Sequence, residues 1–182
     1  MQDDGAPSPI KDMLYESINA ISEAAIQQDL ASNNSRKVIL DILSRAWPDT
    51  LKGDRTENYE TLAESLMHYI LTNALIPSQR KITVDGVEID IVIPDARTLK
   101  TSNKDAIIIL FPKTDDMASI RARLERIHAV QPVRENVWLV QREDLGLPYK
   151  TYEIEASKTF AGIIDDIKKS NKMQSKFKIF RV

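Results

Sequence analysis

The sequence predicts an α/β fold in which a central mixed β-sheet is flanked by helices, with an N-terminal helical extension. Two β-branched runs lie on either side of Asp85-Gly86, the dipeptide most typical of a tight antiparallel hairpin. Two further apolar runs, Asp105–Phe111 and Asn136–Gln141, are separated by a stretch with helical spacing. A strand, a crossover helix and a second strand predict a parallel pair, so the sheet should be mixed.

Composition limits the class of protein. The chain has 182 residues, of which 42% are hydrophobic, enough for one globular domain with a substantial core. The formal net charge of -2 is not a global basic signature, so nucleic-acid binding would depend on local patches. No run approaches the roughly 20 apolar residues that span a membrane. The acidic start MQDDGAPSP lacks the apolar core of a signal peptide, and we expect a cytoplasmic protein with no membrane partner.

Several kinds of site are excluded by residue usage. The absence of cysteine excludes thiolate zinc sites, disulfides and cysteine nucleophiles, and it is compatible with a reducing compartment. The five glycines are isolated from one another, so neither a P-loop nor a GxGxxG turn can be assembled. Two histidines are too few for a multi-histidine metal centre.

Residues 1–8 are expected to be a flexible lead-in, followed by a helical extension over residues 9–55. Ser8-Pro9 is typical of a helix start, and apolar spacing predicts one helix over Pro9–Ala31. A second apolar periodicity ends at Pro48, which stops a helix. Because these helices carry no recognisable chemistry, we expect a packing or oligomerisation element, with a homodimer as one outcome.

An α/β domain over residues 56–182 would begin with a helix capped by Thr56 and running to about Leu75. Glu60, Glu64 and His68 recur every four residues and form one stripe on its polar side. This stripe can be interpreted as a solvated helix face or as part of a ligand set. Helices of this kind usually carry a solvated stripe.

The remaining stretches complete the predicted order. Residues 96–104 and 143–151 are expected to be loops, with helices over about 115–129 and from Ser157 or Thr159 onward. The final residues, 177–182, alternate between apolar and basic side chains, which predicts an edge strand.

The order of elements, together with Asp90 and Lys113, resembles the PD-(D/E)xK nuclease superfamily, whose fold is restriction-endonuclease-like. The resemblance covers roughly residues 56–141. It implies that Asp90, on the second hairpin strand, is the metal-binding aspartate and that Lys113 is the motif lysine. The helix acid of the family corresponds to Glu60, with Glu64 one turn later as the alternative. Mg²⁺ or Mn²⁺ would be the cofactor.

One position departs from the family pattern. The motif reads Phe111-Pro112-Lys113, so an aromatic residue stands where the second acid is expected. Glu88 lies two residues before Asp90 on the same strand face and could replace the missing carboxylate. The catalytic set implied by the resemblance is then Asp90, Lys113 and Glu88, with Lys113 positioning the attacking water.

The resemblance predicts a metal-dependent nuclease-like protein that acts on DNA or RNA phosphodiesters, with activity weakened by Phe111. The alternative is a catalytically inactive nuclease-fold protein that serves as a nucleic-acid-binding or structural subunit. A third interpretation is an unrelated α/β interaction domain. Cations expected to contact a phosphate backbone are Arg121, Lys168, Lys169 and Lys172, although charges of this kind are more commonly part of a solvated face.

Overall fold

The computed structural model describes residues 8–170, and within them it confirms an α/β architecture with a mixed sheet. The α-helices are α1 (Pro9–Ile21), α2 (Glu23–Ala31), α3 (Ser35–Arg45), α4 (Arg55–Asn73), α5 (Ala96–Thr101), α6 (Met117–His128) and α7 (Ile163–Lys169). The strands are β1 (Gln79–Val84), β2 (Val87–Ile93), β3 (Ile107–Leu110), β4 (Val137–Gln141) and β5 (Lys150–Glu153). Residues 1–7 of the expected lead-in over 1–8, the expected strand over 177–182 and Lys172 lie outside the described residues.

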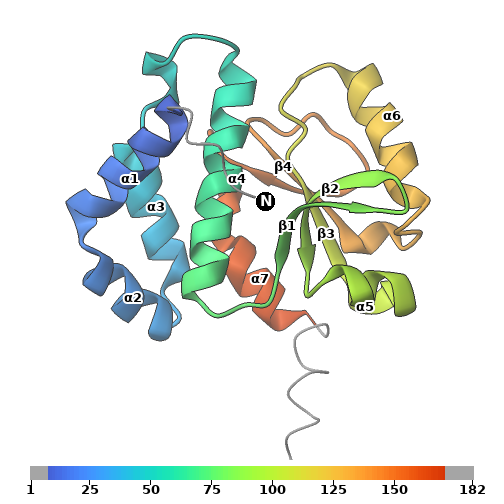
Figure 1. Cartoon of the computed structure of the whole chain (residues 1–182). Coiled ribbons are helices and arrows are strands. Elements are labelled where there is room, and N and C mark those ends of the chain that lie inside the picture. Colours follow the sequence, from blue (N-terminus) through green and yellow to red (C-terminus); the bar gives the residue numbers. More distant parts are fainter. Residues whose placement is uncertain (1–7, 171–182) are drawn as a thin grey trace, which may run out of the picture.

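The five strands follow one another across an open sheet in the order β1-β2-β3-β4-β5 (Figure 1). The β1–β2 and β2–β3 pairs are antiparallel, whereas the β3–β4 and β4–β5 pairs are parallel. The hairpin is confirmed: Asp85 and Gly86 have φ of 49° and 80°, the left-handed conformation that a two-residue turn with the matching twist requires. The crossover through α6 confirms the predicted parallel pair.

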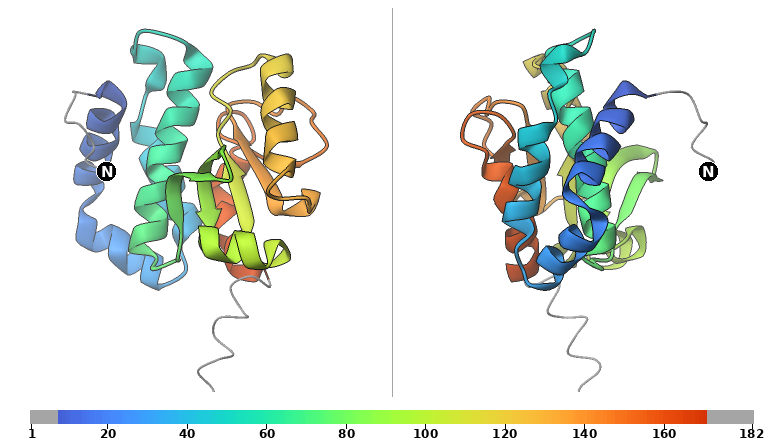
Figure 2. Two further views of the ribbon diagram at one scale, coloured as in Figure 1. Left: turned by 45° about the vertical axis from the view of Figure 1, so that its right-hand side comes forward. Right: turned by 90° about the vertical axis from the view of Figure 1, so that its left-hand side faces the viewer.

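Helices cover both faces of the sheet (Figures 1 and 2). α4 and α7 lie against one face, with α1 and α3 packed beyond them, and α5 and α6 lie against the other. Because both faces are covered, the central strand β3 is apolar throughout and completely buried. Successive side chains of β4 point to opposite faces of the sheet and belong to two different cores. Trp138 faces α4, and Leu139 faces α6.

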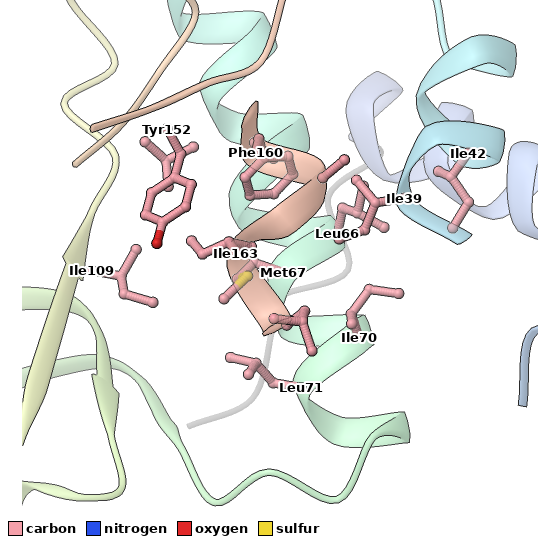
Figure 3. Close-up of a cluster of buried hydrophobic side chains, with 14 of the residues drawn as sticks. Ile39, Ile42, Leu66, Met67, Ile70, Leu71, Ile109, Tyr152, Phe160 and Ile163 are labelled. Atoms are coloured by element: carbon pink, nitrogen blue, oxygen red, sulfur yellow. The ribbon is translucent and has the colours of Figure 1, made fainter. Parts of the chain in front are cut away.

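The larger core joins the N-terminal helices to the sheet. Figure 3 shows side chains from α3, α4, α7 and the strands meeting in this cluster. Its labelled members are Ile39, Ile42, Leu66, Met67, Ile70, Leu71, Ile109, Tyr152, Phe160 and Ile163. The predicted packing role of the N-terminal helices is therefore seen within the chain itself, since α1 and α3 share one apolar core with the sheet.

Local structure differs from expectation at several points. The single helix predicted over Pro9–Ala31 is wrong, because Ser22 adopts φ of 86° and its side chain then caps α2. The expected loops contain α5 and β5, both short elements whose periodicity is too brief to identify. Asp54, and not Thr56, caps α4 through the Glu57 amide at 2.8 Å.

Among the described residues, no helix is both long enough and apolar enough to cross a bilayer.

Candidate functional site

Three of the predicted site residues, Asp90, Glu60 and Lys113, lie at one end of the sheet, where β3 ends. Ile91 of β2 pairs with Ile109 of β3, so Asp90 lies beside the carboxyl end of β3. The Phe111 amide donates to Asp90 Oδ2 at 2.8 Å, and the Lys113 amide donates to Glu60 Oε2 at 2.5 Å. The segment that follows β3 therefore connects a carboxylate of β2 with a carboxylate of α4.

Glu60 connects the ends of two parallel strands. Its side chain is buried on α4, with an exposed fraction of 1%, and Oε1 accepts a second hydrogen bond from the Arg142 amide at 3.0 Å. Arg142 directly follows β4, as Lys113 follows β3. Burial raises the pKa of Glu60 to about 7, although both amide hydrogen bonds act in the opposite direction.

Glu64 lies one turn further along α4 and is also 1% exposed. Lys113 Nζ lies 2.5 Å from its Oε2, and Arg80 Nε of β1 lies 3.6 Å from its Oε1. Neither oxygen of Glu64 has a hydrogen-bond partner among the described residues, so the carboxylate is held there by these two ion pairs. Lys113 itself has φ of 60°, a left-handed conformation that is costly for a residue with a side chain.

The interpretation of Glu60, Glu64 and His68 as a solvated stripe is wrong for the two acids. Only His68 is exposed, whereas Glu60 and Glu64 face the end of the sheet. They tolerate burial because backbone amides and two basic side chains at the strand ends supply partners for their charges. Those partners are distant in sequence, and helical periodicity cannot reveal them.

Asp90 is engaged from the opposite side of the sheet. Its carboxylate is 14% exposed, and Arg123 Nη2 of α6 donates to Oδ1 at 2.8 Å. Arg123 Nη1 donates to the main-chain carbonyl of Phe111 at 3.3 Å. One guanidinium therefore bridges the carboxylate of β2 and a carbonyl oxygen at the end of β3.

Glu88 does not join this group. It is exposed near the hairpin turn, where it lines a cavity of about 300 Å³ together with Gly86, Val87, Arg123 and Arg126. The structure thus places Glu88 closer to the arginines of α6 than to the acids of α4, and it provides no contact that would make Glu88 a substitute for an acid at Phe111.

The cations predicted to contact nucleic acid are separated. Arg121 is exposed on α6, which covers one face of the sheet, whereas Lys168 and Lys169 lie in the last turn of α7 on the other (Figure 1). Lys168 Nζ donates to Asn33 Oδ1 at 3.0 Å. Among the described residues, the predicted cations therefore form two surfaces.

The carboxylates as arranged do not provide a divalent-metal site. Mg²⁺ and Mn²⁺ require several converging oxygen ligands. Both oxygens of Asp90 and both oxygens of Glu60 already accept hydrogen bonds, and Glu64 faces two cations. Residues 8–170 contain no group of three or more acidic or histidine side chains arranged to hold a metal ion.

Sequence reasoning did not identify three basic residues of this site. None of Arg80, Arg123 and Arg142 was among the predicted site residues. Arg142 carries a sequence signal comparable to that of Lys113, since each is a basic residue just after a buried strand. The partners of Arg80 and Arg123 lie 16 and 33 positions away in the chain, on other elements, and are decided by packing.

Comparisons with known proteins provide no independent assignment. No protein-family profile, curated protein or solved structure matches the chain.

Proposed function

We propose that this chain is a catalytically inactive protein with a restriction-endonuclease-like fold, and that it binds nucleic acid without cutting it. The observation that carries the proposal is the position of Arg123. Its guanidinium contacts Asp90 Oδ1 and the Phe111 carbonyl, two oxygens of the kinds that a hard divalent cation prefers. A permanent cation supplied by the protein takes the place that a metal ion would need.

The other elements of the nuclease-like motif are likewise committed to the fold. Lys113 Nζ forms an ion pair with buried Glu64, so it is not placed to position a water molecule. Phe111 is completely buried where the family has an acid. This combination supports the interpretation that the motif has become a set of contacts between α4, α6 and the strand ends.

Binding of a phosphate backbone is supported by the outer surface of α6. Arg121 and Arg126 are exposed, and Arg126 lines the cavity beside the hairpin turn together with Arg123. Lysine and arginine side chains presented in this way neutralise phosphates and release counterions. The absence of a stacked aromatic platform in the sequence favours backbone contacts over recognition of unstacked bases.

Two measurements test the proposal. Supercoiled, branched and single-stranded nucleic acids are incubated with Mg²⁺ or Mn²⁺ and either wild type or Asp90→Asn. We expect no cleavage by either protein. Metal-dependent cleavage that disappears in Asp90→Asn would contradict the inactive assignment.

Binding is measured separately by fluorescence anisotropy at about 50 and 200 mM salt, a range over which phosphate contacts weaken strongly. The double variant Arg121→Gln, Arg126→Gln should weaken binding and reduce the salt dependence by about two charges. The matched control Lys168→Gln, Lys169→Gln removes the same charge from α7 on the other side of the sheet. An equal loss of nucleic-acid affinity in the two double variants would contradict the assignment of the binding surface to α6.

A second candidate, a structural subunit that associates with another copy through the N-terminal helices, is favoured by one observation. Trp47 is 64% exposed and lines a cavity of about 490 Å³ between α1 and the end of α3. The same cavity is lined by Asp12, Glu16 and Arg45, which are opposite charges on one surface. A two-fold contact pairs a surface with itself, and it can therefore place Arg45 of one copy against the acids of the other.

A further inference from the structure

A third cavity, remote from α6, lies where α1 and α4 meet the edge strand β1. Its volume is about 300 Å³. It is lined by Lys11, Leu14, Tyr15, Ser65, His68, Tyr69, Thr72 and Arg80. These residues combine two permanent cations, one titratable imidazole and four hydroxyl groups, and no carboxylate is among them.

Among the described residues, the charged side chains that line this cavity are all positive, which favours an anion. Glu64 is the acid nearest to Arg80, but it is buried behind the lining and also faces Lys113. The Nε atom of Arg80 lies 3.6 Å from Glu64 Oε1, while the Arg80 side chain is 20% exposed and lines the cavity.

The pKa of His68 depends on the same charges. Burial lowers the pKa of His68, and the neighbouring Arg80 lowers it further, whereas Glu64 acts in the opposite direction. Among the described residues, the other titratable groups that line the cavity are Lys11 and Tyr15 of α1 and Tyr69 of α4. Glu23 of α2 acts on Tyr69 by its charge. An anion placed among these groups would favour the protonated imidazole.

We propose that the cavity between α1, α4 and β1 binds a phosphate group, held by Lys11, His68 and Arg80 and by the hydroxyls around them. Phosphate suits this lining because it offers several strong acceptor oxygens and a charge between one and two at neutral pH. Arginine and lysine can then form charge-assisted hydrogen bonds with it. The group can belong to free phosphate or to the terminal phosphate of a nucleic acid. The site does not depend on the proposed role of α6.

The chain offers a direct experiment because it has only two histidines. Imidazole NMR signals of the full chain are followed during titration with inorganic phosphate, with chloride at equal ionic strength as the reference. We expect a saturable shift of His68, accompanied by a rise in its pKa. His128 should be unaffected, because its ring is held by the Gln131 carbonyl and the Tyr149 hydroxyl at 2.9 and 2.6 Å.

Substitutions of the lining residues test whether these residues bind the phosphate. Lys11→Gln and Arg80→Gln should each weaken phosphate binding about tenfold, the effect of losing one charge-assisted contact. Lys104→Gln removes an exposed charge from the region before β3 and should leave binding unchanged. If Arg80→Gln unfolds because Glu64 loses a partner, Lys11→Gln alone decides the result.

Two ligands identify the source of the phosphate group. Tighter binding of a 5′-phosphorylated dinucleotide than of inorganic phosphate assigns the site to a nucleic-acid end, whereas equal or weaker binding assigns it to free phosphate. No saturable shift of His68 at about 10 mM phosphate, well above a Kd of about 1 mM, overturns the proposal. A shift of equal size in Lys11→Gln and wild type overturns it as well.

Discussion

Arg123 and Asp90 form an ion pair at 2.8 Å that connects α6 to the second strand of the sheet. The same guanidinium reaches the carbonyl of Phe111, so the pair also fixes the segment that follows β3. Side chains of Arg123 and Asp90 are 24% and 14% exposed, which limits screening by water. The Asp90 carboxylate therefore connects β2 with α6 and with the segment that follows β3.

The first prediction concerns the stability of this contact. Asp90→Asn and Arg123→Met should each lower the free energy of unfolding by about 1–3 kcal/mol, because each leaves a partly buried polar or charged partner. Urea denaturation measures the change. Glu88→Gln makes the same acid-to-amide change on an exposed side chain of the same strand, and it should alter stability by less than about 0.5 kcal/mol.

Coupling between the two residues provides the sharper test. The double variant Asp90→Asn, Arg123→Met should lose less unfolding free energy than the sum of the losses in the two single variants. The difference should be about 1 kcal/mol or more. Additive losses would mean that the ion pair does not stabilise the fold.

The second prediction is a pH dependence carried by Glu60. Its pKa is raised to about 7 in the folded protein, above the ordinary value of 4.5, so the folded state binds its proton more tightly than the unfolded state. Stability should therefore fall as the pH rises from about 4.5 to 7, by an amount on the order of 3 kcal/mol, and this contribution should level off above pH 7.

Glu60→Gln isolates this effect, since all other titrating groups are shared with wild type. The difference in unfolding free energy between the two proteins should change across pH 5–7. A difference that is constant with pH would show that Glu60 titrates at its ordinary value. Carboxylate NMR of the folded protein gives the pKa directly.

The third prediction separates side-chain and backbone effects at Lys113. Lys113→Ala and Lys113→Gly both remove the ion pair with Glu64, yet glycine accepts the φ of 60° without steric cost. Lys113→Gly should therefore be more stable than Lys113→Ala by about 1 kcal/mol. The opposite order, measured by thermal or urea unfolding, would contradict the left-handed conformation after β3.

The fourth prediction concerns self-association at Trp47. If the N-terminal helices form a two-fold contact, light scattering at increasing concentration should detect dimers of wild type, and Trp47→Ser should remove them, since exposed tryptophans often dominate interface energy. Tyr15→Ser, which replaces another exposed aromatic residue outside the Trp47 cavity, serves as the control. Dimers that persist unchanged in Trp47→Ser would rule out this surface.

Much of the fold could be predicted because it depends on local chemistry. Asp85-Gly86 specifies the hairpin, and the apolar run of β3 identifies a strand covered on both faces. The convergence of Asp90 and Lys113 at one end of the sheet follows from strand order alone. The break at Ser22 was missed because apolar spacing continues across it while the backbone changes direction.

By itself, the sequence determined which residues could belong to a nuclease-like motif and that Phe111 interrupts it. Only the tertiary structure decided what those residues do, because a carboxylate on α4 or β2 acquires its role from the charge that packs against it. Arg123 neutralises Asp90, Lys113 pairs with Glu64, and backbone amides hold Glu60. These pairings depend on how the helices pack against the sheet. Apolar periodicity along the chain therefore does not predict them.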